Sequence, residues 1–368
     1  MFTMRSSLAS LIYLCFVGIT SAANSFAGSN LYYAAGLSPY QRTTLLSSMQ
    51  SAGMKVLRVW LDGQSTASTK ATTITSYRSL ETSSVGSYDP TVLNLLDDFM
   101  IDAQKYGIKL IISMHSWNSL SREVTFTSQI LDHCHRYFYE KSEAIAAFDN
   151  RLRYILNHTH KTLGKPWKQL NQYIFAFEAQ NKAMVGKGED YINTHMNWQC
   201  DHANTIKSTL GSNSGILVMT GGESWMTESV KSAWLGCAAL DVVAIHAYGV
   251  GDFSTSNILT YVNQAKSAGK KLIFQEWGAC YFNTENNNCP AGTPLPTSTR
   301  NNNIKVSFSP LSKAQKWLKN SHADMGFANH RGRRSLALLA GPTKSGPSWH
   351  GSMGTTLRSE YRILLGIL

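Results

Sequence analysis

Seven short apolar runs alternate along this chain with longer stretches whose apolar residues recur every three or four positions. The runs span residues 30–37, 55–61, 109–115, 173–181, 215–221, 241–248 and 271–277. The helical stretches span residues 41–52, 89–106, 144–162, 190–210, 224–235, 257–268 and 311–320. Strand and helix repeating in one order predict parallel strands, which are buried on both faces and therefore appear as nearly continuous runs of Val, Ile and Leu.

Seven strand-helix units, with an eighth to close the sheet, predict an α/β fold: a single (β/α)8 TIM barrel. An open doubly wound sheet is the alternative, but the first strand is not followed by the glycine-rich phosphate loop typical of that fold. The eighth unit is expected to be incomplete or atypical, because no convincing strand-helix pair follows Phe327. Residues 325–327 are the candidate start of the eighth strand. Asp89 followed by Pro90 predicts the N-cap and first turn of the second helix.

The two ends of the chain differ in character from its middle. Residues 1–23 are typical of a secretory signal, with Arg5, an apolar stretch over 8–20 and small residues at 21–23. That stretch is shorter than the roughly 20 apolar residues of a membrane-spanning helix. We therefore expect a secreted, extracellular and monomeric protein without a membrane anchor, whose barrel occupies residues 24–327.

Residues 328–368 are expected to form an irregular basic tail, which accounts for much of the formal net charge of +11. A naturally disordered tail and a shifted reading frame or retained intron both fit this composition. Glu360 is the one acidic residue there. Its basic residues are Arg331, Arg333, Arg334, Lys344, Arg358 and Arg362. The chain lacks the aromatic and basic interleaving that tracks single-stranded nucleic acid, so no nucleic-acid partner is expected.

The cysteines suggest an oxidised protein. Of the six, Cys15 leaves with the signal, and an odd set of five remains. Cys280 with Cys289 is the favoured disulfide because both lie in one loop, and Cys200 with Cys237 is the second candidate. Buried, reduced thiols are the alternative.

Other short patterns carry less chemistry. Asn157-His158-Thr159 is the only N-glycosylation sequon in the chain. The histidine pairs at 133 and 135 and at 158 and 160 have no matched second set at zinc-site spacing, so we interpret them as surface histidines. No metal and no cofactor is expected.

Polar residues gather where the apolar runs end, which is where a (β/α)8 barrel places its catalytic groups. They are Arg58, His115, Asn181, Glu223, His246, Tyr248 and Glu276. Glu276 stands out because a buried strand delivers its carboxylate to the point where the chain turns, which makes it a candidate nucleophile. A retaining glycosidase needs a second carboxylate about 5 Å away.

From about residue 29 to residue 320 the chain resembles glycoside hydrolase family 5, the secreted endo-β-glycanases that include cellulases and β-mannanases. The resemblance rests on five motifs in the family's order: Arg58 in Leu-Arg-Val-Trp, His115, Asn181 in Phe-Glu-Ala-Gln-Asn, His246-Ala-Tyr248, and Glu276 in Gln-Glu-Trp-Gly. It implies a retaining β-glycosidase that acts on a β-linked cell-wall polysaccharide, with mannan preferred to glucan.

The resemblance also implies roles for single residues. Glu276 is the expected nucleophile, held ionised by Arg58 and Tyr248. Asn181 is expected to bond the sugar 2-hydroxyl. The remaining substrate contacts expected around the site are His115, His246, Glu223 and the sugar-stacking candidates Trp117, Trp225 and Trp277.

The chain departs from the family at one position. The general acid/base glutamate follows the asparagine directly, whereas here Lys182 follows Asn181. An ammonium group is a poorly matched acid and, while charged, cannot act as the base for the second step. Glu178 is an unpromising substitute for the acid/base, because four residues of strand place it about 13 Å from residue 182. Glu223 is the better candidate substitute.

Two hypotheses follow for this copy. The first is a secreted retaining β-glycosidase, endo-β-1,4-mannanase-like, with severely reduced turnover. The second is a pseudoenzyme that binds β-glycan without cutting it. Glutamate and lysine codons differ by one base, so a decayed enzyme and a dedicated binder both fit the substitution.

Overall fold

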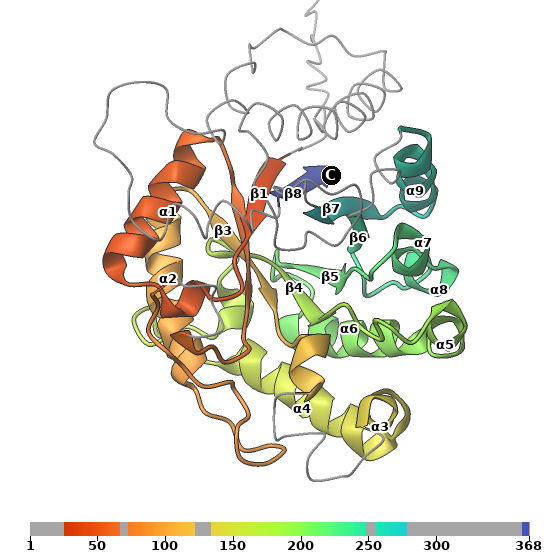
Figure 1. The fold of residues 1–368 in the computed structure, drawn as a ribbon, viewed down its shortest axis with the longest axis horizontal. Coiled ribbons are helices and arrows are strands. Elements are labelled where there is room, and N and C mark those ends of the chain that lie inside the picture. Colours follow the sequence, from red (N-terminus) through yellow and green to blue (C-terminus); the bar gives the residue numbers. More distant parts are fainter. Residues whose placement is uncertain (1–25, 67–72, 122–133, 248–254, 278–362, 368) are drawn as a thin grey trace, which may run out of the picture.

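The strands of this protein form a closed barrel in the order β1 to β8 (Figure 1). The computed structural model describes residues 26–66, 73–121, 134–247, 255–277 and 363–367. The strands are β1 (Phe26–Asn30), β2 (Val56–Trp60), β3 (Lys109–Ser113), β4 (Ile174–Asn181), β5 (Leu217–Gly221), β6 (Val242–Ala247), β7 (Lys271–Trp277) and β8 (Ile363–Ile367). Strands β1 to β7 run parallel, which confirms the expected α/β barrel.

The closing strand is atypical in its direction. β8 lies between β1 and β7 and pairs antiparallel with both, with Gly366 opposite Phe26 and Ile367 opposite Leu272 (Figure 1). Its five residues come from the segment expected to be a tail and were not among the expected strands. The candidate start at residues 325–327 lies outside the described residues, as do the boundaries proposed after residues 23 and 327.

Helices surround the barrel (Figure 1). The α-helices are α1 (Pro39–Ser51), α2 (Thr91–Lys105), α3 (Cys134–Glu140), α4 (Ser142–Asn157), α5 (Glu189–Thr194), α6 (Asn197–Leu210), α7 (Met226–Ser229), α8 (Ser232–Leu235) and α9 (Thr255–Ser267). Short 3-10 helices are η1 (Ala34–Gly36), η3 (Trp117–Ser121) and η4 (Trp167–Gln169). In α2 the buried residues Val92, Leu96, Phe99 and Ala103 recur at helical spacing, as the apolar pattern predicted. Of the helices in the described part, none is both long and apolar enough to cross a membrane.

The helix starts follow local side-chain chemistry. At α1 the Ser38 hydroxyl accepts from the Gln41 amide N–H at 3.3 Å, and the Gln41 side chain accepts from the Ser38 N–H at 2.8 Å. At α2 the Asp89 carboxylate accepts from the Thr91 N–H at 2.9 Å, while Pro90 occupies the N-cap itself. The predicted cap of α2 is therefore one residue early.

Three other sequence predictions differ from the structure. The single helix expected over residues 224–235 is divided into α7 and α8. The first strand was placed at residues 30–37, whereas β1 ends at Asn30 and the apolar residues that follow are buried in turns and η1. Burial alone does not decide between a strand and a packed turn. The single helix expected over residues 190–210 is split, because side chains of Thr194 and His195 bond the Tyr191 carbonyl oxygen and end α5.

The histidines at 158 and 160 are not surface residues. Asp97 of α2 accepts from the Trp167 indole N–H at 2.7 Å and lies 3.0 Å from His158 Nε2. His160 is fully buried, and its Nε2 lies 3.9 Å from the same carboxylate. The interpretation as surface histidines was wrong. Their buried partner, Asp97, lies about 60 residues earlier in the chain, so the local pattern around residues 158 and 160 does not reveal it. Within the described residues no group of three metal-ligating side chains occurs.

A disulfide joins Cys200 of α6 to Cys237, which follows α8. This confirms the second of the two candidate pairs. The favoured pair, Cys280 with Cys289, lies outside the described residues. The bond closes a segment of 37 residues that contains β5, α7 and α8.

Removing this disulfide should lower stability without changing the fold. For a sequence separation of 37 residues, the loss of loop-closure entropy in the unfolded chain is worth about 2–4 kcal/mol. We expect the double variant Cys200→Ser/Cys237→Ser to unfold at lower temperature and lower urea concentration than the parent. Reducing agent should lower the Tm of the parent by more than it lowers the Tm of the double variant. Equal stability of the two oxidised proteins would contradict a formed bond.

Candidate active site

A fully buried guanidinium lies at the centre of the site. Arg58 is the middle residue of β2 and has no exposed surface. Its Nη1 donates to Glu276 Oε1 at 2.7 Å, its Nε donates to Glu178 Oε1 at 3.0 Å, and its Nη2 donates to Asn181 Oδ1 at 2.8 Å and also to Glu178. One cation thus ties together the ends of β4 and β7.

The two carboxylates that Arg58 joins are both buried. Glu178 lies three residues before the end of β4, and its second oxygen accepts from the Gln275 side-chain amide at 2.6 Å. Glu178 is therefore saturated by structural partners below the rim of the barrel, as its strand position predicted. Burying a carboxylate without a hydrogen-bond partner is costly, and these charge-assisted hydrogen bonds offset that cost.

His246 is neutral, and its unprotonated Nδ1 lies toward Glu276. Strand register places it directly beside Glu276. Because the Gln275 amide nitrogen donates to Glu178, its oxygen must accept from His246 Nε2, 2.8 Å away. Nδ1 then carries no proton and lies 3.7 Å from Glu276 Oε2. Burial lowers the pKa of His246 to about 3, so the ring stays neutral at physiological pH.

Lys182 faces Glu276 across the site. Its Nζ lies 3.4 Å from Glu276 Oε2, and the lysine side chain keeps 19% of its surface exposed, whereas the carboxylate keeps none. Lys182 has a φ of 54°, a left-handed conformation that non-glycine residues seldom adopt. Such a conformation costs of order 1–3 kcal/mol and is typical of functional sites. The sequence expectation that residues 182 and 276 confront one another is therefore met in space.

The end of β4 is held from behind by residues that the sequence analysis did not single out. Tyr139 of α3 donates to Gln180 Oε1 at 2.8 Å and accepts from the Met184 N–H at 2.9 Å. The Gln180 amide nitrogen lies 2.8 Å from His115 Nδ1. Strict alternation along β4 would put Gln180 on the same face as Glu178. The register irregularity between Glu178 and Asn181 breaks that alternation, so the sequence pattern gives no signal for Gln180.

His115 lies on that rear face rather than against Glu276. It is buried, and its ring packs against Phe138 of α3 at 5.4 Å and Phe148 of α4 at 5.6 Å. Burial, with a smaller contribution from Arg151, holds the pKa of His115 well below its usual range. His115 therefore contacts the aromatic residues of the helix layer and supports Gln180, and its expected contact with substrate stays a prediction.

Glycine residues allow β5 to approach this cluster. A Cβ at Gly221 would lie 1.9 Å from the Gln180 carbonyl oxygen, and one at Gly222 would lie 2.4 Å from His246 Nε2. The Gly221-Gly222 pair is therefore required by the close approach of backbone and imidazole.

Glu223 follows directly and carries a buried carboxyl group. Neither of its side-chain oxygens has a hydrogen-bond partner in the described part of the chain. Burial, and then the nearby charge of Glu228, raise the pKa of Glu223 well above its usual range, although Lys182 opposes this. Such surroundings favour the protonated form of the carboxyl group, which is able to donate a hydrogen bond.

The candidate sugar-stacking residues differ in how exposed their side chains are. Trp225, at the N-cap of α7, exposes 47% of its surface. Trp117, in η3, is partly buried and packs against the core. The backbone of Trp277 ends β7, but its side chain and the whole of Tyr248 lie outside the described residues. Trp225 is thus the described tryptophan best placed to offer a ring face.

The neutral state of Glu223 has a measurable consequence. In the unfolded chain a glutamate ionises near pH 4.3, whereas the folded protein keeps Glu223 protonated to a higher pH, so this residue costs stability as pH rises above that value. We expect the stability of Glu223→Gln relative to the parent to increase with pH above 4.3, by at most about 1.4 kcal/mol per pH unit. Urea unfolding between pH 4 and 7 measures this; a constant difference over that range would contradict a protonated Glu223.

Comparison with known proteins agrees with this geometry. The family model described as cellulase (glycosyl hydrolase family 5) matches residues 20–308. The mannan endo-1,4-beta-mannosidase A of Aspergillus aculeatus is 24% identical over 296 residues, which are 75% of this chain and 74% of that protein. The probable mannan endo-1,4-beta-mannosidase A-2 of Aspergillus terreus is 25% identical over 273 residues, covering 69% and 66% of the two chains.

Solved structures show the same fold. The endo-1,4-beta-D-mannanase of Thermotoga petrophila superposes with a TM-score of 0.59 at 21% identity, over 79% of this chain and 86% of that one. The endo-1,4-beta-mannanase of Rhizomucor miehei superposes with a TM-score of 0.53 at 20% identity, over 70% and 78%. The family model covers well over half of the sequence, and the chain therefore belongs to glycosyl hydrolase family 5, the glycoside hydrolases whose (β/α)8 barrel it shares.

Proposed function

We propose that this protein is a secreted, β-1,4-mannan-directed member of family 5 in which Lys182 greatly reduces hydrolysis. The observation that carries the proposal is the 3.4 Å separation of Lys182 Nζ and Glu276 Oε2. The relatives named as mannan endo-1,4-beta-mannosidases support mannan as the polysaccharide. Export rests on the signal-like residues 1–23.

In the proposed reaction Glu276 is the nucleophile. Its carboxylate attacks the anomeric carbon, a glycosyl-enzyme ester forms, and the bond to the leaving oxygen breaks. Arg58 and Lys182 stabilise the carboxylate form of Glu276. Asn181 accepts from Arg58 through its Oδ1 and donates one amide N–H to Ser116 Oγ at 3.3 Å, so these two contacts would hold its second N–H toward the sugar 2-hydroxyl.

Two steps of this reaction lack their usual partner. The leaving alkoxide needs a proton, and water needs a base when it later attacks the ester. Lys182 supplies neither well, because an ammonium holds its proton too tightly to be a matched acid and has no lone pair to act as a base. The ion pair with Lys182 also competes for the oxygen that must attack.

Restoring the carboxylate should restore turnover. We expect Lys182→Glu to hydrolyse β-mannan at least about a hundredfold faster than the parent, because general acid/base catalysis contributes roughly 10²–10⁴. Lys182→Gln is the matched control, since it breaks the ion pair without supplying an acid or base and should stay slow. Adding Glu276→Gln to the restored enzyme should abolish the gain.

The assay should include β-mannan, β-glucan and an activated aryl β-glycoside. A phenolate leaves without protonation, so the parent should release a burst of it and then stall at the ester. Equal hydrolysis of mannan by the parent and Lys182→Glu would contradict the assignment of residue 182 as the missing acid/base.

A dedicated β-glycan binder is the second candidate function. The ion pair between Lys182 and Glu276 favours it, because the pair neutralises both side chains at the point where the chemistry would occur. This candidate predicts that the parent binds manno-oligosaccharides without turnover and that Lys182→Glu restores hydrolysis. Measurable hydrolysis by the parent, assayed beside calorimetric binding, therefore separates the two functions.

Trp225 should contribute to binding under either function. Its exposed ring offers an apolar face against which the C–H face of a sugar packs. We expect Trp225→Ala to weaken oligosaccharide binding up to about tenfold, corresponding to roughly 0.5–1.5 kcal/mol. Trp225→Phe keeps an aromatic face and should retain most of the affinity; equal loss in both variants would exclude stacking.

A further inference from the structure

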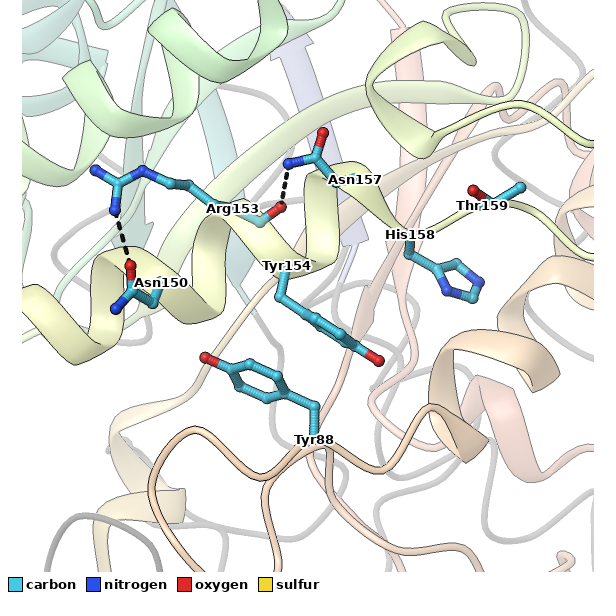
Figure 2. Close-up of a pocket in the computed structure, with 7 residues that line it drawn as sticks. All are labelled: Tyr88, Asn150, Arg153, Tyr154, Asn157, His158 and Thr159. Carbon is cyan, nitrogen blue, oxygen red and sulfur yellow. Dashed lines mark hydrogen bonds between the residues drawn. The ribbon is translucent and has the colours of Figure 1, made fainter.

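A pocket of about 460 Å³ lies at the C-terminal end of α4, and the three residues of the single sequon form part of its wall (Figure 2). Asn157 is the last residue of α4, and His158 and Thr159 follow it into the connection that leads to β4. The side chains of Asn157 and Thr159 are both exposed. The acceptor triplet is therefore presented on the surface and opens onto a concave site.

Two stacked tyrosines form the apolar part of this pocket. Tyr154, one turn before Asn157, packs against Tyr88, with ring centroids 4.2 Å apart and ring planes 26° apart. Figure 2 shows the two rings beside the end of the helix that bears Asn157. Arg153 and Asn150 lie on the other side and supply polar groups. Aromatic faces with a few polar groups at the edge are typical of sites that hold a sugar ring.

The Asn157 amide is already oriented by the helix. Its Nδ2 donates to the Arg153 carbonyl oxygen at 2.8 Å (Figure 2). A glycosylated asparagine amide retains one N–H, so this hydrogen bond survives attachment of a sugar. The helix end therefore holds the amide in a fixed direction.

The position is compatible with substrate binding at the other end of the barrel. Asn157 lies in the connection before β4, whereas Lys182 lies in the connection after it. The eight residues of β4 separate the two ends by about 26 Å at roughly 3.3 Å per residue. A glycan on Asn157 would leave the candidate active site open.

We propose that Asn157 is an N-glycosylation site and that its first N-acetylglucosamine packs in the pocket beside Tyr154 and Tyr88. The donor is an oligosaccharide linked to a lipid diphosphate. The Asn157 Nδ2 forms a bond to the anomeric carbon, the bond from that carbon to the diphosphate oxygen breaks, the lipid diphosphate leaves, and one amide proton passes to solvent. The proposal requires passage through the secretory pathway and is independent of the polysaccharide that the active site binds.

The first test detects covalent attachment of a glycan to Asn157. The full chain is expressed in a yeast secretory host, and the intact mass is measured before and after treatment with an endoglycosidase that leaves one N-acetylglucosamine. Thr159→Ser keeps the sequon and should carry glycan, whereas Asn157→Gln and Thr159→Ala should not. A parent protein without glycan at Asn157 overturns the proposal.

The second test addresses the pocket. The protein trimmed to one N-acetylglucosamine should have a higher Tm than Asn157→Gln, because the sugar ring covers the exposed faces of the tyrosines. In a Tyr154→Ala background the same pair, with and without the sugar, should have equal Tm values. A sugar-dependent rise in Tm that persists in Tyr154→Ala, or no rise in the parent, overturns the packing part of the proposal.

Discussion

The buried guanidinium of Arg58 is the interaction on which the rest of the site depends. It has no access to water, and it is stable there only because Glu178 and Glu276 both contact it. Breaking such a network by removing one member leaves an unpaired buried charge, which typically costs about 3–5 kcal/mol. The barrel must close tightly for β2, β4 and β7 to place these three side chains together, so fold and site stabilise one another.

Lys182 adds a second cation to this arrangement. Two cations, Arg58 and Lys182, now face two carboxylates, Glu178 and Glu276, within one buried cluster. A glutamate at position 182 would leave the cluster with one cation and three acids, the state in which one carboxyl group is pushed toward protonation. With lysine at this position, the cluster has neither a third carboxyl group nor the repulsion between carboxylates that would raise the pKa of one of them.

Support for the site comes largely from residues outside the cluster. Tyr139, Gln180 and His115 form a chain of hydrogen bonds behind β4, and Gln275 fixes both Glu178 and the tautomer of His246. These contacts orient the side chains that would touch a sugar. None of these hydrogen bonds involves the side chain of residue 182.

The sequence by itself determined the parallel barrel and the position of Glu276 at a strand end, because burial patterns and the alternation of strands with helices are local properties of the chain. Only the tertiary structure decided that His115 faces the helices, that Asp97 buries two histidines and that residues 363–367 close the barrel in the antiparallel direction. The physical reason is that each of these depends on partners 20 or more residues away, whose approach is set by packing and register and leaves no periodic trace in the sequence.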